Sequence, residues 1–177
     1  MKEERSAQNA LDWYEARIFA LVILVAVFSF FFRIIMVNGS SMVPTLSGGD
    51  RLIIWAAGYT PEHGDVIVID GYIDYGKPLV KRIIAKDGDT VDIDFTSGAV
   101  VVNGEVLEEP YIAEPTYDSF DVTFPLVVPE NTVFVLGDNR NGSSDSRVSD
   151  IGCIDERDIM GKVVFRFSPF DRIGGIE

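Results

Sequence analysis

One apolar segment near the N-terminus constrains this chain more than any other feature. From Ile18 to Val37 it reads IFALVILVAVFSFFFRIIMV, in which only Ser29 and Arg33 are not apolar. A helix of this length reaches about 30 Å, the thickness of a bilayer's hydrocarbon core. We therefore predict a cytoplasmic tail over residues 1–17, a transmembrane anchor over residues 18–37 and a folded domain over residues 38–177.

A cleaved signal peptide is the competing interpretation, because its apolar region is usually about 7 to 15 residues long. Such a peptide has small residues at its cleavage site, whereas the bulky Arg33–Met36 follow here, which favours an uncleaved anchor. Lys2, Arg5 and Arg17 precede the segment, and the residues directly after it contain only Arg51. This bias predicts a single-pass cell-membrane protein with its N-terminus in the cytoplasm and its domain outside.

The net charge belongs to the domain beyond the anchor. The chain has 15 basic and 28 acidic side chains, a formal charge of −13, and the charges of residues 1–37 sum to zero. Such acidity excludes a nucleic-acid binder that works through a basic patch. The 47% hydrophobic content excludes disorder. The single Cys153 excludes an intrachain disulfide and a cysteine zinc cluster, and we predict no metal and no cofactor.

Short apolar runs separated by turn residues follow the anchor, and Asn103–Gly104 has the composition of a type I′ hairpin turn. We predict a mainly β fold: a partly open antiparallel β-barrel or sheet with one N-terminal transmembrane helix. A long excursion covers about residues 96–131, and a helical turn or two lies near Asp155–Met160. The predicted strands are Arg51–Trp55, Val66–Ile69, Leu79–Ala85, Thr90–Phe95, Val100–Val102, Glu105–Leu107, Thr132–Leu136 and Val163–Phe167.

Two residues that often carry chemistry have simpler explanations here. A Ser-His-Asp triad would have to use His63, the chain's one histidine, but a lone histidine in a turn is usually a solvated surface residue. Cys153 could be a nucleophile, although a single cysteine between Gly and Ile is usually a small core residue. We therefore look for a different nucleophile and base.

A serine paired with a lysine is the stronger candidate. Ser40 and Ser41 follow the predicted membrane exit, and the stiff, apolar sequence Met42–Leu46 after them argues against a mere linker. Lys81 lies in a strand pattern and shares its face with apolar neighbours. An ammonium there is costly unless it is neutralised or paired, and a lysine of lowered pKa is a general base. The alternative is an edge strand from which Lys81 reaches water.

A third polar segment, Gly137–Arg147, directly follows a predicted strand. Its composition is typical of a solvated loop. However, acidic and basic residues alternate in it at a strand end, so a hydrogen-bonded platform beside a catalytic site is the other interpretation.

With these motifs in view, the chain resembles bacterial type I signal peptidases, the membrane-bound serine-lysine endopeptidases, in their single-anchor Gram-positive-like form. The resemblance implies hydrolysis of signal peptides from exported preproteins at the outer face of the cytoplasmic membrane, through an acyl-enzyme. Its expected partners are signal-peptide-bearing preproteins and the lipid bilayer, with no nucleic acid and no metal. The matching motifs, apart from the anchor, are Gly39–Leu46, Gly49–Leu52, Lys81–Ile84, Gly88–Val91, Gly137–Arg147 and Ile159–Val163.

The resemblance also implies roles for individual residues. It makes Ser41 the nucleophile, Lys81 the general base and Ser143 the residue that holds the lysine in place. It pairs Asp145 with Arg147, and Asp138 with Arg82, as two ion pairs that support the site. Met42 is expected to line the substrate pocket.

The chain departs from the family pattern in two places. Many members have Pro before Gly where Ala85–Asp89 stands here, which is expected to alter a turn only, and the other departure bears on the chemistry. Some members have a serine two residues before the nucleophile whose hydroxyl helps to stabilise the oxyanion, and Gly39 stands there in this chain. The backbone N–H of Ser41 is therefore expected to carry more of this role, with Ser40 as the alternative. Two other functions stay open: a serine-lysine protease with a narrow client such as a pilin, and a non-catalytic membrane-anchored β scaffold.

Overall fold

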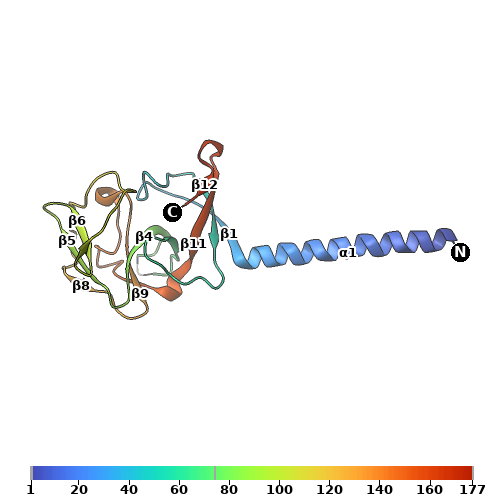
Figure 1. Cartoon of the computed structure of the whole chain (residues 1–177), viewed down its shortest axis with the longest axis horizontal. Helices are drawn as coiled ribbons and strands as arrows, with labels where there is room; N and C mark the ends of the chain where they lie inside the picture. Colours follow the sequence, from blue (N-terminus) through green and yellow to red (C-terminus); the bar gives the residue numbers. More distant parts are fainter. Residues whose placement is uncertain (1, 74, 177) are drawn as a thin grey trace.

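The computed structural model describes residues 2–73 and 75–176, with side chains from residue 13 onward. These residues form a long N-terminal helix followed by a β domain (Figure 1). The elements are α1 (Lys2–Phe31), β1 (Phe32–Met36), β2 (Arg51–Trp55), β3 (Val66–Ile69), β4 (Leu79–Lys86), β5 (Thr90–Asp94), β6 (Ala99–Val102), β7 (Glu105–Val106), β8 (Leu126–Val127), β9 (Thr132–Leu136), β10 (Ile154–Asp155), β11 (Ile159–Ser168) and β12 (Gly174–Gly175). Short 3-10 helices cover Arg140–Gly142, Glu156–Asp158 and Phe170–Arg172.

Two antiparallel sheets build the domain. The larger has the strand order β1-β2-β11-β3-β4-β9-β10, with β12 added beside β11, and the smaller has the order β7-β6-β5-β8. The small sheet lies at the end of the domain away from α1, whereas β1 and β11 lie next to the helix (Figure 1). The predicted mainly β fold with a partly open antiparallel sheet is confirmed.

The core joins these parts. On the α1 side, Leu52, Ile54 and Val163 of the larger sheet pack with Met42 and Leu46 of the loop after β1. At the other end, side chains of the small sheet pack against β9 and β4, among them Val91, Ile93, Val100, Ile84, Phe134 and Leu136. The loop that carries Ser41 is thus held by buried apolar side chains within the domain.

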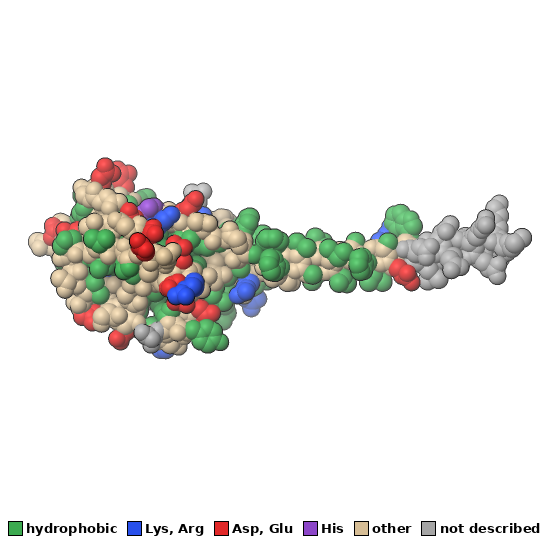
Figure 2. Space-filling model, turned by 90° about the horizontal axis from the view of Figure 1, so that it is seen from below, with side chains coloured by type: hydrophobic (Ala, Val, Ile, Leu, Met, Phe, Trp, Pro, Cys, Tyr) green, Lys and Arg blue, Asp and Glu red, His purple; other side chains and the backbone are tan. Residues whose placement is uncertain are grey.

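The helix ends at Phe31, before the predicted end at Val37. The 19 residues Trp13–Phe31 are long and apolar enough to cross a membrane, and apolar side chains cover the visible part of this segment in Figure 2. Residues 32–36 instead form β1, whose Ile35 packs against the core cluster that contains Val37. A continuous apolar run suits a membrane helix and a strand equally well, so the sequence did not separate them. The tail, anchor and domain limits in the bilayer stay predictions.

The predicted strands agree closely with the observed ones. The bounds of β2, β3 and β9 are those expected from the sequence, and β11 is longer than Val163–Phe167. The turn at Asn103 and Gly104 has the positive φ angles, 53° and 84°, that a type I′ hairpin requires. The predicted excursion contains most of the small sheet, and the helical turn near residues 155–160 is a 3-10 turn at Glu156–Asp158. The strands β1, β8, β10 and β12 were not predicted.

Candidate active site

Three segments of the chain meet at the site. Ser41 lies in the loop after β1, Lys81 lies on β4, and residues 137–147 follow β9. The backbone N–H of Asn139 donates to the carbonyl of Ser41 at 3.0 Å, and the Asn139 side chain donates to the carbonyl of Ser40 at 3.1 Å. These two hydrogen bonds fix the serine loop against the segment after β9.

The Lys81 ammonium group contacts the Ser41 hydroxyl directly. Lys81 Nζ donates to Ser41 Oγ at 2.8 Å, and the lysine is 2% exposed. Burial disfavours the charged form and lowers the pKa of Lys81 from 10.5 to about 8, although the carboxylates of Asp145 and Asp138 act in the opposite direction. Arg147 adds to the lowering. The alternative of a solvent-reaching lysine on an edge strand is wrong, because β4 lies between β3 and β9.

Ser143 and Gly137 pack beside the Ser41–Lys81 pair. Ser143 is 3% exposed, and within the described residues its Oγ has no hydrogen-bond partner. A Cβ added at Gly137 would lie 2.2 Å from Ser143 Oγ and 2.5 Å from the Ser41 carbonyl oxygen, so only glycine fits between them. The hydrogen bond through which Ser143 was expected to hold Lys81 is absent from the described contacts, and this role stays a prediction.

Two buried ion pairs support the site from the segment after β9. Arg82 Nε and Nη2 donate to the two carboxylate oxygens of Asp138 at 2.9 and 2.8 Å. Arg147 Nε and Nη2 donate to those of Asp145 at 2.8 and 2.9 Å. Asp138 also accepts from the hydroxyl of Thr45, which ties it to the serine loop. Gly137–Arg147 is therefore a platform of buried charges, and the solvated-loop interpretation is wrong.

A further part of this platform was missed from the sequence. Arg140 is fully buried, and its Nη1 and Nη2 donate to the two carboxylate oxygens of Glu109 at 2.8 and 2.6 Å. The guanidinium of Arg82 stacks on the ring of Tyr111, 4.0 Å from its centre. Glu109 and Tyr111 belong to the predicted excursion, and no sequence spacing links them to the segment after β9.

A cleft of about 370 Å³ opens at the Ser41–Lys81 pair. Its lining consists of residues 35–38 and 78–81 together with Ser41, Met42, Val68 and Met160. Met42 is 1% exposed and belongs to the core as well as to this lining. Gly39 has a φ of +97°, a conformation in which a side chain is strained.

The two residues set aside from the sequence lie in ordinary surroundings. The side chain of His63 is 54% exposed and contacts Asp89 at 2.7 Å. Cys153 is partly buried beside the core cluster of the small sheet. Neither residue belongs to the cleft lining.

Comparison with known proteins identifies the family. Residues 10–168 match the family model described as signal peptidase, peptidase S26. The chain belongs to this family. It is similar to a signal peptidase I from Bacillus licheniformis, with 37% identity over 98% of each chain. It is also similar to a signal peptidase I P from Bacillus subtilis subsp. natto, with 35% identity over 97% of this chain and 96% of the relative.

A solved structure agrees with this membership. The crystal structure of a signal peptidase I from Enterococcus faecalis V583 aligns with a TM-score of 0.50 and 31% sequence identity. The alignment covers 59% of this chain and 97% of the neighbour. A probable signal peptidase I-1 from Synechocystis is 40% identical over 78% of this chain and 72% of its own length. The chain is thus a peptidase of this family with an apolar N-terminal helix.

Proposed function

We propose that the chain removes signal peptides from exported preproteins with Ser41 as nucleophile and Lys81 as general base. The hydrogen bond between Lys81 Nζ and Ser41 Oγ, at 2.8 Å inside the protein, carries this proposal. A lysine with a pKa of about 8 has an appreciable neutral fraction near pH 7, and only the neutral amine accepts a proton. The family membership gives the reaction its substrate class.

The reaction is an acyl transfer to Ser41. Neutral Lys81 takes the hydroxyl proton as Ser41 Oγ attacks the carbonyl carbon of the scissile bond. The resulting ammonium gives this proton to the leaving amine nitrogen when the carbon–nitrogen bond breaks. Water then attacks the acyl-enzyme carbonyl while Lys81 accepts its proton. The bond to Ser41 Oγ breaks, the Lys81 ammonium returns the proton to Ser41 Oγ, and the signal peptide leaves with a free carboxylate.

The backbone N–H of Ser41 is the proposed oxyanion donor. Within the described residues this N–H makes no hydrogen bond, which leaves it free for a developing negative charge. Gly39 contributes no hydroxyl, and Ser40 is exposed. Met42 and the cleft walls at residues 35–38 and 78–81 are proposed to hold the residues before the scissile bond.

The topology is part of the same proposal. We place the N-terminus in the cytoplasm, helix α1 in the bilayer and the β domain outside, as a single-pass membrane protein. Ser41 lies in the loop after β1, which directly follows the helix, so a preprotein whose apolar segment lies in the same bilayer brings its cleavage site toward the serine. Confinement to two dimensions supplies part of the orientation that the reaction needs.

Cleavage of a purified preprotein by the full chain in detergent tests the proposal. We expect Ser41→Ala and Lys81→Met to abolish cleavage while each protein remains folded by circular dichroism. Ser40→Ala is the matched control, because the Ser40 side chain is exposed and only its carbonyl makes a hydrogen bond to Asn139. Cleavage by Ser41→Ala, or its loss in Ser40→Ala alone, would contradict the assignment.

A further inference from the structure

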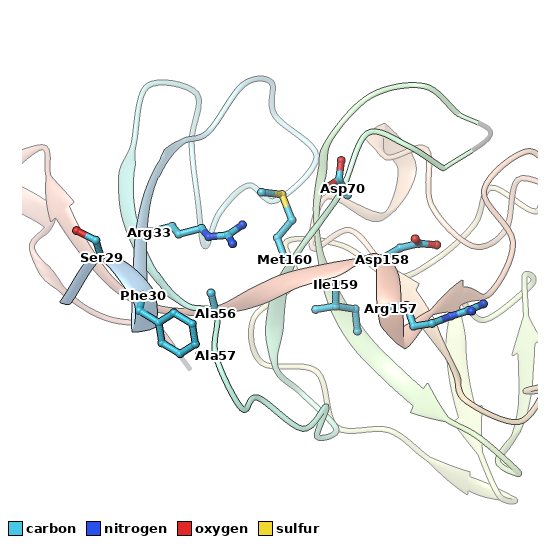
Figure 3. Close-up of a pocket in the computed structure, with 10 residues that line it drawn as sticks. All are labelled: Ser29, Phe30, Arg33, Ala56, Ala57, Asp70, Arg157, Asp158, Ile159 and Met160. Atoms are coloured by element: carbon cyan, nitrogen blue, oxygen red, sulfur yellow. The ribbon is translucent and has the colours of Figure 1, made fainter. Parts of the chain in front are cut away.

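A second cavity, of about 460 Å³, lies beside the active-site cleft. Ser29 and Phe30 from the last turn of α1 and Arg33 from β1 form the wall on the helix side. Asp70, which follows β3, and residues 157–160, which lead into β11, form the opposite wall. Figure 3 shows Arg33 on one side of this cavity, Asp70 and Asp158 on the other, and the Met160 side chain between them.

The cavity adjoins the active-site cleft at Met160, whose side chain lines both. Strand β1 also runs along both: Arg33 lies at the second cavity, and residues 35–38 lie at the cleft. The path from the end of α1 to Ser41 therefore passes the second cavity first and the cleft second. A substrate segment that connects the bilayer with a scissile bond at Ser41 must cover the same path.

The length of this path indicates which part of the substrate lies there. An extended strand rises about 3.3 Å per residue, so Arg33 lies about 13 Å before Val37, the residue that follows β1 and lines the cleft. A substrate in extended conformation spans this distance with about four residues. We take the residue directly before the scissile bond to lie beside Val37 in the cleft. The residue that reaches the second cavity is then about five positions before the scissile bond, between the apolar segment of the signal peptide and its cleavage region.

The charges of the cavity favour a cationic side chain. Within the described residues, Arg33, Asp70 and Asp158 form no ion pair, whereas Arg157 is held by Asp155 at 2.9 and 2.6 Å and points away from the cavity in Figure 3. The cavity thus holds two carboxylates and one guanidinium outside the described ion pairs, and Asp70 Oδ1 accepts from the backbone N–H of Tyr72 at 3.3 Å.

The two carboxylates come from facing positions. Ile69 pairs with Ile159, and the N–H of Asp70 donates to the carbonyl of Asp158 at 2.8 Å, so the two aspartates lie opposite each other just beyond the paired ends of β3 and β11. Like charges directly opposite each other destabilise a sheet. A lysine or arginine side chain between them offsets this repulsion.

We infer that the cavity is a substrate subsite for the residue about five positions before the scissile bond, where Asp70 and Asp158 favour a basic over an acidic side chain. The inference rests on the proposed function, because it takes the substrate to be a signal peptide that leaves the bilayer beside α1. It adds specificity-determining residues outside the cleft that contains Ser41.

Three versions of one preprotein, with Lys, Ala or Glu at this position, test the inference. With the full chain in detergent, we expect kcat/KM to fall in the order Lys, Ala, Glu, with about a threefold to tenfold difference between Lys and Glu for charges at a partly exposed site. The double variant Asp70→Asn/Asp158→Asn should lose this order through KM. Asp158→Lys should reverse the order, and Arg33→Gln should strengthen the preference for Lys.

Asp87→Asn is the matched control, because Asp87 is an exposed aspartate in the turn after β4 and lies outside the cavity. It should retain the wild-type order. Equal cleavage of the three versions by the wild type would overturn the subsite alone, whereas cleavage of none would overturn the proposed function. A third outcome would assign the cavity to a lipid headgroup and overturn the inference. In that case the double variant would change kcat/KM equally for all three substrate versions, and only when phospholipid vesicles are added.

Discussion

Replacement of Lys81 by methionine should abolish cleavage and stabilise the domain at neutral pH. The wild-type protein keeps a nearly inaccessible amine beside Ser41, and burial lowers its pKa from 10.5 to about 8. This difference corresponds to about 3 kcal/mol of unfavourable free energy in the folded state at pH 7. Methionine has a similar length and no charge, so Lys81→Met removes this cost with little change in packing.

The effect must depend on pH in a defined direction. Between pH 8 and pH 10.5, Lys81 carries a proton in the unfolded chain and has lost it in the folded chain. The unfolded state then binds more protons, so the free energy of unfolding of the wild type rises with pH across this window. The advantage of Lys81→Met should therefore be about 3 kcal/mol at and below pH 7 and vanish above pH 10.5.

Thermal or denaturant unfolding of the two proteins in the same detergent, at pH 7 and at pH 10.5, measures this difference. Other groups that titrate in the window are common to both proteins and cancel in the comparison. The wild-type kcat/KM should rise about fivefold from pH 7 to pH 8, since a base of pKa 8 is about one-tenth neutral at pH 7 and half neutral at pH 8. A stability difference that is the same at both pH values, or a rate that climbs to pH 10, would refute the buried neutral lysine.

Three further substitutions test the surroundings of the site. Gly137→Ala should lower kcat/KM by more than about tenfold, because its methyl group displaces Ser143 or the Ser41 carbonyl. Gly174→Ala is its control and should retain activity, because the space around Gly174 is open. Ser143→Ala should lower cleavage yet raise the free energy of unfolding by about 1 kcal/mol, since it removes a buried hydroxyl that lacks a partner; a fall in both would contradict this. Asp138→Asn should destabilise the protein by about 3 to 5 kcal/mol in thermal unfolding, because it leaves Arg82 buried beside a neutral amide. Asp155→Asn is its control and should change the melting temperature little, because the ion pair of Asp155 with Arg157 lies at the surface.

The sequence predicted the strands well where its pattern was local. Strands β2, β3 and β9 are bounded by turn residues, and the Asn103–Gly104 turn requires positive φ angles that few residues tolerate. Strand β1 was missed because Phe32–Met36 continues the apolar run of the helix. Only its pairing with β2 and the burial of Val37 distinguish the two, and both depend on residues distant in sequence.

The candidate site was predicted from short local motifs together with the family resemblance that they carry. The expected partners Ser41 and Lys81 are in contact, and the expected ion pairs Arg82–Asp138 and Arg147–Asp145 are present. The pair formed by Arg140 and Glu109 was not expected, because it joins the segment after β9 to a loop without a recognisable pattern. The second cavity was not expected either, since its two aspartates face each other only through the pairing of β3 with β11.

The paired charges around Lys81 explain how a lysine among carboxylates can have a lowered pKa. Asp138 and Asp145 each attract the ammonium and favour its charged form. Both are held by the two nitrogens of a buried arginine, and Arg147 itself repels the ammonium. Arg147 thereby partly cancels the field of the carboxylates at Lys81, and burial remains the largest influence on the pKa of Lys81. The ion pairs of the platform thus do more than hold the segment after β9 in place: they allow the amine beside Ser41 to be neutral.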